Sequence, residues 1–423
     1  METYGKILII AMPLFLLLVL FEKWYGWKKG FETVRTLDMI SSLSSGVTNS
    51  TKDVLGLSIA IISYEWLVNH IAIYHIQTNW IIYLIAFLAL DFAGYWTHRL
   101  AHEINFFWNN HIIHHSSEEF NLACALRQSV SVFVRIYAVL LIPAALLGVP
   151  AQVIAIVAPL HLFAQFWYHT RHIQKMGWLE YIIVTPSHHR VHHAMNPEYL
   201  DKNYGQIFIF WDRLFGTYQE ELDSIPAVYG VTRPVKTWNP IKINFMHIGL
   251  LIKDAWRTKD WKSKFTIWFK PLGWRPADVE QAFPVDKVKD VYHFEKYDTY
   301  APKGMQVYLW FQLFALLLLV SYLFGNVASI GHSNIFIYGA FIFAQVYTLT
   351  EFMDRNPKAY MYEIIKNAIC IAGILYFGGW FGLEAIWSPS SYILIAYFII
   401  SASVVTVYSI EKTTTLPPLT TAH

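Results

Sequence analysis

The chain has 423 residues, of which 55% are hydrophobic and only 15% are charged. Soluble globular chains carry about 25% charged residues, so this composition excludes an ordinary cytosolic globule and a disordered chain. The formal net charge of +2 is too balanced to indicate nucleic-acid binding. Two cysteines, Cys124 and Cys370, stand far apart in the sequence and support neither a disulfide framework nor a cysteine metal cluster.

Long apolar runs predict that the chain is an all-α, polytopic membrane protein. A helix needs about 20 mostly apolar residues to cross the ~30 Å hydrocarbon core of a bilayer. The first run lacks the small residues of a signal-peptide cleavage site, so we expect it to be an anchor. We expect about nine spans, at roughly 5–22, 54–73, 79–97, 131–149, 151–171, 306–325, 334–352, 363–381 and 391–410.

The basic residues between these runs predict the orientation, because Lys and Arg mark short cytoplasmic loops. They gather after the first and the seventh runs, at Lys23, Lys28, Lys29, Arg35, Lys52, Arg355 and Lys358. The loops at 74–78 and 326–333 contain no Lys or Arg. The alternation predicts an N-terminus outside, a C-terminus inside, and basic loops on the cytoplasmic side.

The same runs suggest a division of the chain into five parts. Residues 172–305 are polar, charged and rich in Trp and Pro, so we expect a cytoplasmic segment with short helices near the membrane surface. The parts are N-terminal membrane helices at 1–78, a catalytic core at 79–217, an interfacial segment at 218–305, C-terminal membrane helices at 306–412, and a disordered tail at 413–423.

Histidines carry the chemical signal. The chain has 18, and eight of them form three boxes in which residues three or four apart share one face of a helix. Neutral imidazole is a good ligand for iron, zinc and copper, and this many exceeds what one tetrahedral zinc ion needs. The pattern predicts a site for two metal ions. The boxes hold His98 and His102, then His111, His114 and His115, then His189, His192 and His193.

The expected topology places all three boxes on the cytoplasmic side. Two expected spans, 131–149 and 151–171, separate the first two boxes from the third. The chain would therefore leave the cytoplasmic face and return to it. One or three spans would have put the boxes on opposite sides of the bilayer.

Several other residues near the boxes have more than one interpretation. His169, His172 and His188 are further candidate ligands, and His161 is either a ligand or a hydrogen-bonding residue in the bundle. Asp91, two turns before His98, either orients an imidazole or joins two helices. We interpret the isolated histidines as structural: His70, His75, His247, His293, His332 and His423.

Glu103 follows the first box directly, so it points to a neighbouring face of the helix from His102. It either holds a cofactor or is a solvated charge at a helix end. His102 and Glu103 do not begin an HExxH zinc motif, because Phe106 stands where that motif needs its second histidine.

The boxes and their flanking residues resemble the fatty acid hydroxylase / sterol desaturase superfamily, and within it the alkylglycerol monooxygenases. The boxes alone mark the superfamily, whereas three flanking blocks narrow the resemblance. These blocks are Ser116-Ser117-Glu118, Ala125-Leu126-Arg127-Gln128-Ser129 and Asp201-Lys202-Asn203-Tyr204. The resemblance runs from about residue 90 to residue 360.

The resemblance implies a membrane-bound monooxygenase with two non-haem irons held by the eight box histidines. It further implies that Glu103 contributes to the use of tetrahydrobiopterin or a related reduced pterin. The implied reaction inserts one oxygen atom of O2 at the carbon next to the ether oxygen of an alkylglycerol. The product falls apart to a fatty aldehyde and glycerol. In this scheme Glu103 and Asp91 are the candidate catalytic residues beside the metal ligands.

Two other functions are open at this point. One is a sterol or fatty-acyl hydroxylase or desaturase of the same superfamily, which would take electrons from a ferredoxin or cytochrome partner. The other is a bis-histidine haem electron carrier or a metal transporter. The host membrane is a bacterial inner membrane or the endoplasmic reticulum, since no retention signal decides between them.

Overall fold

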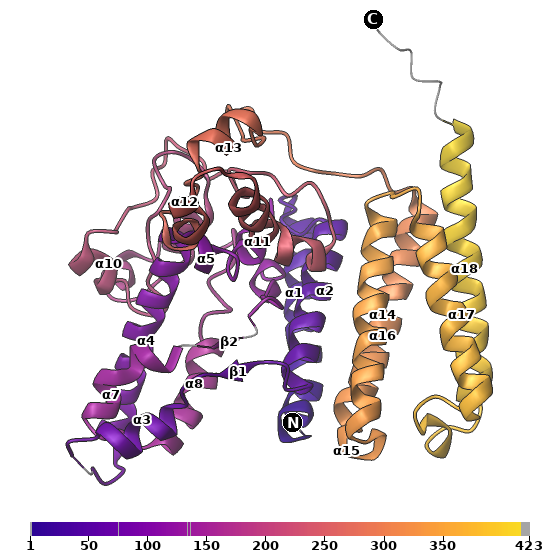
Figure 1. Ribbon diagram of the computed structural model, residues 1–423, viewed down its shortest axis with the longest axis horizontal. Coiled ribbons are helices and arrows are strands. Elements are labelled where there is room, and N and C mark those ends of the chain that lie inside the picture. The colour runs from indigo at the N-terminus through magenta and orange to yellow at the C-terminus, as the bar shows by residue number, and fades with distance from the viewer. Residues whose placement is uncertain (1, 75, 133, 136, 416–423) are drawn as a thin grey trace, which may run out of the picture.

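The computed structural model describes residues 2–74, 76–132, 134–135 and 137–415, and it is almost wholly helical (Figure 1). This confirms the all-α membrane fold. Among the described residues, six helices are long and apolar enough to cross a membrane. They are α1 (Glu2–Lys29), α4 (Trp80–Glu103), α14 (Lys303–Gly325), α16 (His332–Met353), α17 (Ala359–Phe377) and α18 (Ser390–Thr415).

Shorter elements connect these helices and cover one end of them. The two strands, β1 (Ile59–Ala60) and β2 (Val134–Arg135), pair in parallel. The remaining α-helices are α2 (Thr36–Val54), α3 (Tyr64–Ile71), α5 (Asn105–Trp108), α6 (Ile112–His115), α7 (Ile142–Leu146), α8 (Ala151–Phe163), α9 (Pro186–His193), α10 (Phe210–Phe215), α11 (Pro240–Arg257), α12 (Trp261–Thr266), α13 (Ala277–Ala282) and α15 (Val327–Ile330). Single 3-10 turns lie at Cys124–Leu126, Tyr137–Leu141, Gly177–Tyr181, Ile267–Phe269 and Leu383–Ala385.

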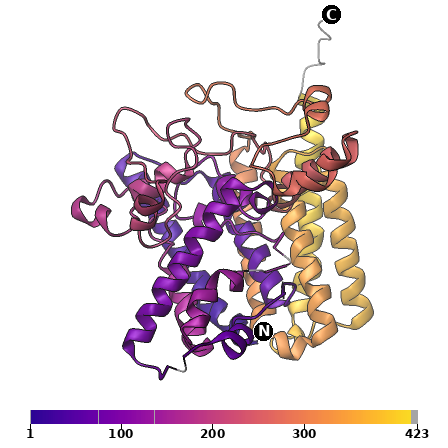
Figure 2. The same ribbon diagram turned by 60° about the vertical axis from the view of Figure 1, so that its left-hand side comes forward.

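The molecule has two lateral halves joined through α1 and α2. Helices α14, α16, α17 and α18 stand side by side as a C-terminal bundle, and α4, α7 and α8 form the opposite half (Figures 1 and 2). Helix α2 packs against both α14 and α16, and α1 packs against α14. Helices α11, α12 and α13 lie over the end of the half that contains α4 (Figure 1), and α11 also contacts α2 and α16.

The prediction of nine continuous spans is not confirmed, because three of the apolar runs are broken into short pieces. In the run 54–73, α2 ends at Val54 and Gly56 takes a positive φ of 67°, which stops the helix. In the run 131–149, the described residues form β2, the 3-10 turn Tyr137–Leu141 and α7, which has Pro143 at its start. The run 151–171 contains α8, which has Pro159 inside it and ends at Phe163.

The loop assigned to residues 23–53 also needs correction, because most of it is helix α2, which is buried in the protein. Its serines replace apolar contacts with hydrogen bonds: the Ser41 hydroxyl donates to the Trp238 carbonyl at 2.7 Å. Lys52 is only 3% exposed and donates to the Ser129 carbonyl at 3.1 Å. Lys52 is therefore part of the interior and does not report the orientation of a loop.

These elements bring the histidine segments to one end of the molecule. Helix α4 ends there, and α5 and α6 follow it. The chain then leaves through β2 and α7 and comes back through α8, so short elements make the return that two full spans were expected to make (Figure 1). Helix α11 contacts the ends of both halves: the His247 ring hydrogen-bonds the Asn105 carbonyl at 2.9 Å, and Asn239 donates to Glu351 at 2.8 Å.

Helix α18 extends to Thr415, so the first three residues of the expected disordered tail are helical. Residues 416–423, including His423, lie outside the described residues, and so does His75.

Candidate metal centre

Nine imidazoles from four segments gather in two adjacent groups at the end of α4. Within each group, one nitrogen of every ring lies within 4.8 Å of the others. We call them the five-histidine group and the four-histidine group. The five-histidine group contains His98, His102, His111, His115 and His192, and the four-histidine group contains His114, His169, His189 and His193.

The five-histidine group is assembled from α4, α6 and α9. The last two turns of α4 place His98 and His102 on its buried face. The Nε2 atoms of His98 and His111 lie 3.0 Å apart, and those of His102 and His115 lie 3.1 Å apart. The His192 Nε2 atom, from α9, lies 3.1 Å from that of His115.

The four-histidine group forms around α9 and the loop that follows α8. His189 and His193 are one turn apart on α9, and their Nε2 atoms lie 3.0 Å apart. The His169 Nε2 atom approaches that of His189 at 2.8 Å and that of His114 at 3.4 Å. The rings of His115 and His193 stack at 4.3 Å between centroids, so the two groups share a wall.

The outer nitrogens of four rings show which nitrogen carries the proton. In each of these rings Nδ1 lies 2.9–3.3 Å from a backbone carbonyl oxygen, which can only accept. Nδ1 therefore donates, and Nε2 presents a lone pair to the centre of its group. The pairs are His98 with Tyr204, His192 with Lys202, His114 with Arg127, and His169 with Gln165.

This proton assignment tests whether the groups fit a metal. The Nε2 atoms of His114 and His169 are both acceptors, yet they face each other at 3.4 Å. Two lone pairs at that distance repel unless a cation lies between them. Carbonyl groups behind ligating imidazoles are the usual means of fixing the tautomer and ring orientation at metal sites. The donor set and its surroundings fit bound metal ions.

Burial keeps these rings uncharged and ready to act as ligands. Burial lowers the pKa of His114 to about 3 and holds the pKa values of His111 and His189 well below their ordinary value of 6.5. A neutral imidazole is the form that binds a metal. At neutral pH these imidazoles are therefore already uncharged, and they can bind a metal ion without first losing a proton.

Two sequence-predicted ligands lie outside both groups. The His172 Nε2 atom hydrogen-bonds the Thr33 hydroxyl at 3.1 Å, on the far side of the loop that carries His169. The His188 Nδ1 atom accepts from the Thr185 backbone N–H at 3.3 Å and so caps the start of α9. Neither ring is brought to the centre.

Asp91 contacts none of the nine grouped imidazoles. The Nε2 atom of His161 lies 2.8 Å from Asp91, whose carboxylate also accepts from the backbone N–H groups of Ile207 and Phe208 and from the indole of Trp211. It is fully buried and ties α4 to α8 and to the 207–211 segment. Of its two interpretations, this arrangement corresponds to the contact between helices.

Glu103 lies at the end of α4 and outside the groups. Its side chain is 43% exposed and pairs with Arg99, one turn earlier, at 2.8 Å. A carboxylate so placed can meet a soluble molecule from outside while the metal ligands stay covered.

Sequence reasoning did not assign a role to two segments that hold the ligands in place. The backbone carbonyls of Lys202 and Tyr204 accept hydrogen bonds from His192 and His98, and the turn that carries these carbonyls has positive φ angles at Asp201 and Asn203. Asp and Asn tolerate this left-handed conformation, so their presence is the local feature of the sequence that indicates a turn here.

The second of these segments contains Arg127, which is 2% exposed. Its guanidinium donates to Ser42 at 2.9 Å, to Ser116 at 2.9 Å and to Asp38 at 2.7 Å. Its carbonyl faces the His114 ring. Arg127 thus joins α2 to the loop that carries the second histidine box.

A cavity of about 530 Å³ leads from the membrane-facing helices to the histidines. Five of the nine grouped rings line its inner end: His98, His111, His114, His169 and His189. Apolar side chains of α1, α2 and α8 form much of the remaining lining, among them Met12, Val47 and Phe163, and α2 also contributes the polar residues Asn49, Ser50 and Asp53. Gln165 and Gln206 add amide groups beside the rings.

The comparisons with known proteins agree with this site. The family model described as fatty acid hydroxylase matches residues 83–217, which contain all nine grouped histidines. No solved structure matches the chain.

Three relatives are named alkylglycerol monooxygenase. The human protein is 34% identical over 84% of this chain and 80% of its own length. The Xenopus tropicalis protein is 33% identical over 84% and 79%, and the Danio rerio protein is 32% identical over 86% and 81%. With this identity along most of both sequences, the chain belongs to the alkylglycerol monooxygenase family and contains its fatty acid hydroxylase domain.

Proposed function

We propose that this protein is a membrane-bound monooxygenase that cleaves ether lipids of the alkylglycerol class. The observation that carries the proposal is the cavity that connects an apolar, membrane-facing lining to two groups of metal-ready imidazoles. The names of the relatives indicate the same substrate and reaction.

The shape of the cavity suits one alkyl chain. The stretch of α1 that lines it, from Tyr4 to Leu16, rises by about 18 Å. That length is close to half of the ~30 Å hydrocarbon core, which is the depth of one leaflet. Phe15 of α1 packs on Phe166 at 4.6 Å, close to His169, so the Leu16 end of the stretch lies toward the histidines. The alkyl tail would lie along α1 and its ether oxygen beside the rings.

The side chains at the inner end of the cavity can bind the polar end of the substrate. The Gln165 side-chain amide N–H donates to the Gln206 side-chain amide oxygen at 3.3 Å, and the backbone carbonyl of Gln165 accepts from His169. Amide groups in this position can hydrogen-bond the glycerol hydroxyls. We propose that they hold the first ether carbon beside the metal centre and limit its contact with water.

The proposed centre contains two non-haem iron ions, held by the five-histidine and the four-histidine groups. Bound iron would supply activation of O2, and the protein supplies the ligands, the orientation and the closed cavity. The overall change adds one oxygen atom to the ether carbon and reduces the other to water with two electrons and two protons. The resulting hemiacetal separates into a fatty aldehyde and glycerol.

We propose that a reduced pterin donates the two electrons and meets the protein near Glu103, on the cytoplasmic side. Lys28 and Lys29 end α1 at the same end of the molecule as the histidines, which supports a cytoplasmic orientation by the positive-inside rule. An electron-donor protein is the alternative source that the experiment below separates.

The test is turnover of 1-O-hexadecylglycerol by the purified, iron-loaded full chain in air. We expect hexadecanal with tetrahydrobiopterin, none without it, and about one aldehyde per pterin oxidised. The variants His114→Ala and His193→Ala should be inactive, whereas His172→Ala should retain at least half of the activity, because its ring lies outside both groups. Aldehyde formation with ferredoxin but not with pterin would contradict the proposed donor, and no aldehyde with either would contradict the proposed function.

A further inference from the structure

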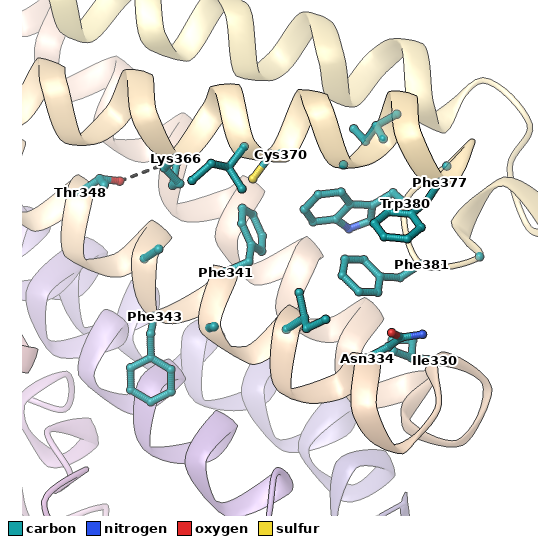
Figure 3. Close-up of a pocket in the computed structure, with 18 of the residues that line it drawn as sticks. Ile330, Asn334, Phe341, Phe343, Thr348, Lys366, Cys370, Phe377, Trp380 and Phe381 are labelled. Carbon is teal, nitrogen blue, oxygen red and sulfur yellow. Dashed lines mark hydrogen bonds between the residues drawn. The ribbon is translucent and has the colours of Figure 1, made fainter.

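A second and larger cavity lies in the C-terminal bundle and shares no lining residue with the histidine cavity. It measures about 1180 Å³ and runs between α16 and α17 (Figure 3). We call it the bundle groove. Nothing in the proposed oxygenation chemistry uses it.

The bundle groove is apolar along most of its length and opens toward the membrane. Phe341, Trp380 and Phe381 gather at one end, as Figure 3 shows. Ile369 and Phe377 line it and are 67% and 80% exposed, so they face the surroundings of the bundle. In a membrane those surroundings are lipid chains.

The other end of the groove is polar. Thr348 and Lys366 meet there across the two helices, with Lys366 Nζ 3.3 Å from the Thr348 hydroxyl (Figure 3). The phenol groups of Tyr347 and Tyr362 belong to the same end, and their rings are 5.8 Å apart. This end lies on the side of the membrane where α11 contacts both halves of the molecule, because Ile241 of α11 lines it too.

The charge at the polar end is already balanced. Lys366 is 7% exposed and lies 2.9 Å from both carboxylate oxygens of Glu363, which is 3% exposed. Gln345 also accepts from Lys366. A buried ionisable group inside a membrane span usually marks a functional site, but this pair leaves no positive charge to hold an anion. The groups that remain at the polar end to bind a headgroup are the hydroxyls of Thr348, Tyr347 and Tyr362.

Glu384 is the one charged residue among the described residues that line the aromatic end of the groove. Its carboxylate accepts from the Trp380 backbone N–H at 2.6 Å and from the Ser390 hydroxyl at 3.2 Å. A negative group here repels anionic headgroups as well. Neither end of the groove therefore favours a phosphate.

The length of the groove fits a single lipid lying along the membrane normal. From Tyr362 to Phe377, α17 rises by about 22 Å, which is most of the ~30 Å hydrocarbon core. An alkyl or acyl chain would fill the apolar part, and a small headgroup would reach Thr348 and the two tyrosines.

We propose that the bundle groove is a binding site for an uncharged, glycerol-headed lipid, separate from the histidine cavity. The apolar length selects the chain, and the hydroxyls with the self-neutralised Lys366–Glu363 pair select a headgroup without charge. The chemical class overlaps the proposed substrate, but binding in the groove requires no turnover and stands independently of the proposed function.

The test uses a hexadecylglycerol that carries a photoreactive diazirine in its chain, added to the full chain in phosphatidylcholine nanodiscs. The His114→Ala background removes turnover, so labelling reports binding alone. We expect adducts on α16 and α17 at groove residues, and at least a fivefold loss of these adducts in Ile369→Trp, which fills the groove. The matched control is Leu375→Trp, a residue that is 70% exposed on the same helix and outside the groove lining.

Competition separates the headgroup classes. Excess unlabelled 1-O-hexadecylglycerol should remove the groove adducts, and the same concentration of hexadecyl phosphate should leave most of them. Equal labelling of Ile369→Trp and the unsubstituted groove would show ordinary boundary lipid and overturn the proposal. Equal competition by hexadecyl phosphate would overturn the selection for an uncharged headgroup. If the groove is labelled while the active protein forms no aldehyde, the proposed function fails and the groove site stands.

Discussion

At the scale of single residues, hydrogen bonds behind the imidazoles organise the centre. Four Nδ1 atoms donate to backbone carbonyls, so four Nε2 lone pairs turn inward. The box spacing predicts which histidines share a helix face, but it does not identify these carbonyl partners. The sequence predicts His169 and His172 alike as candidate ligands, because both lie near the end of an apolar run. Only the fold shows that His169 belongs to the four-histidine group, whereas His172 hydrogen-bonds Thr33.

Glu103 provides a prediction about the cofactor. Its side chain is 43% exposed and outside the histidine groups, so Glu103→Gln should leave the iron content unchanged. We expect the pterin KM to rise about tenfold or more, with a smaller change in kcat, measured by steady-state kinetics at saturating alkylglycerol. The control is Glu65→Gln in α3, which packs on α7 and α8 and lies at the opposite end of α4 from Glu103 (Figure 1). An unchanged pterin KM would remove Glu103 from the cofactor site.

Glu118 provides a prediction about pH. Burial raises the pKa of its carboxyl from the ordinary 4.5 to about 7, against a hydrogen bond from the Tyr297 backbone N–H at 2.5 Å. The folded state therefore holds its proton more tightly than the unfolded state. The stability that this proton contributes is present below pH 4.5 and is lost as the pH rises through about 7.

In Glu118→Gln this part of the pH dependence should disappear. Thermal unfolding of the detergent-solubilised full chain between pH 5 and 8 measures it, and the difference in Tm between variant and wild type should grow in favour of the variant toward pH 8. A difference in Tm that is constant across this range would contradict the raised pKa.

At the scale of helices and strands, the long apolar helices were predictable and the broken segments were not. The charge-poor runs of α1, α14, α16 and α18 leave little alternative to a helix. In the run 54–73, α2 stops before Gly56, and in the run 131–149, Pro143 stands in the first turn of the short helix α7. In the run 151–171, α8 continues past Pro159 and ends at Phe163, so tertiary contacts decide where the chain turns. The sequence predicts a loop where helix α2 lies, yet the Ser41 and Ser45 hydroxyls of this helix donate to backbone carbonyls inside the protein.

Helix α1 carries a prediction about chain length. Ala11 lines the histidine cavity part-way along α1, so Ala11→Phe should block the part of the cavity beyond it. Each methylene that can no longer be buried costs about 0.8 kcal/mol, so excluding two of them lowers kcat/KM about tenfold. We expect that loss for 18-carbon alkylglycerols and little change for 10-carbon ones, measured by aldehyde release.

The matched control for this prediction is Ile10→Phe, which places the same ring on the preceding residue. Ile10 is 75% exposed and lies outside the cavity lining. Equal losses for long and short chains in Ala11→Phe, or the same pattern in Ile10→Phe, would contradict the path of the alkyl chain along α1.

At the scale of the whole molecule, the two halves are joined through α1 and α2, which pack against α14 and α16. The fatty acid hydroxylase domain at residues 83–217 supplies the histidines, whereas α1 and α2, far earlier in the sequence, supply much of the apolar wall. The sequence predicts that three histidine segments converge, from their spacing and the even number of crossings between them. The chain returns to the same end through short elements, so the segments converge although six helices among the described residues, and not nine, are long and apolar enough to cross a membrane.

The central claim is that the two groups of imidazoles each hold a metal ion, and the most direct measurement is the metal content of the purified full chain by inductively coupled plasma mass spectrometry. We expect about two iron ions per chain, one for each histidine group. We expect a loss of about half or more of that iron in His114→Ala and no loss in His172→Ala. A chain that binds no transition metal, or one that loses as much iron in His172→Ala as in His114→Ala, would contradict it.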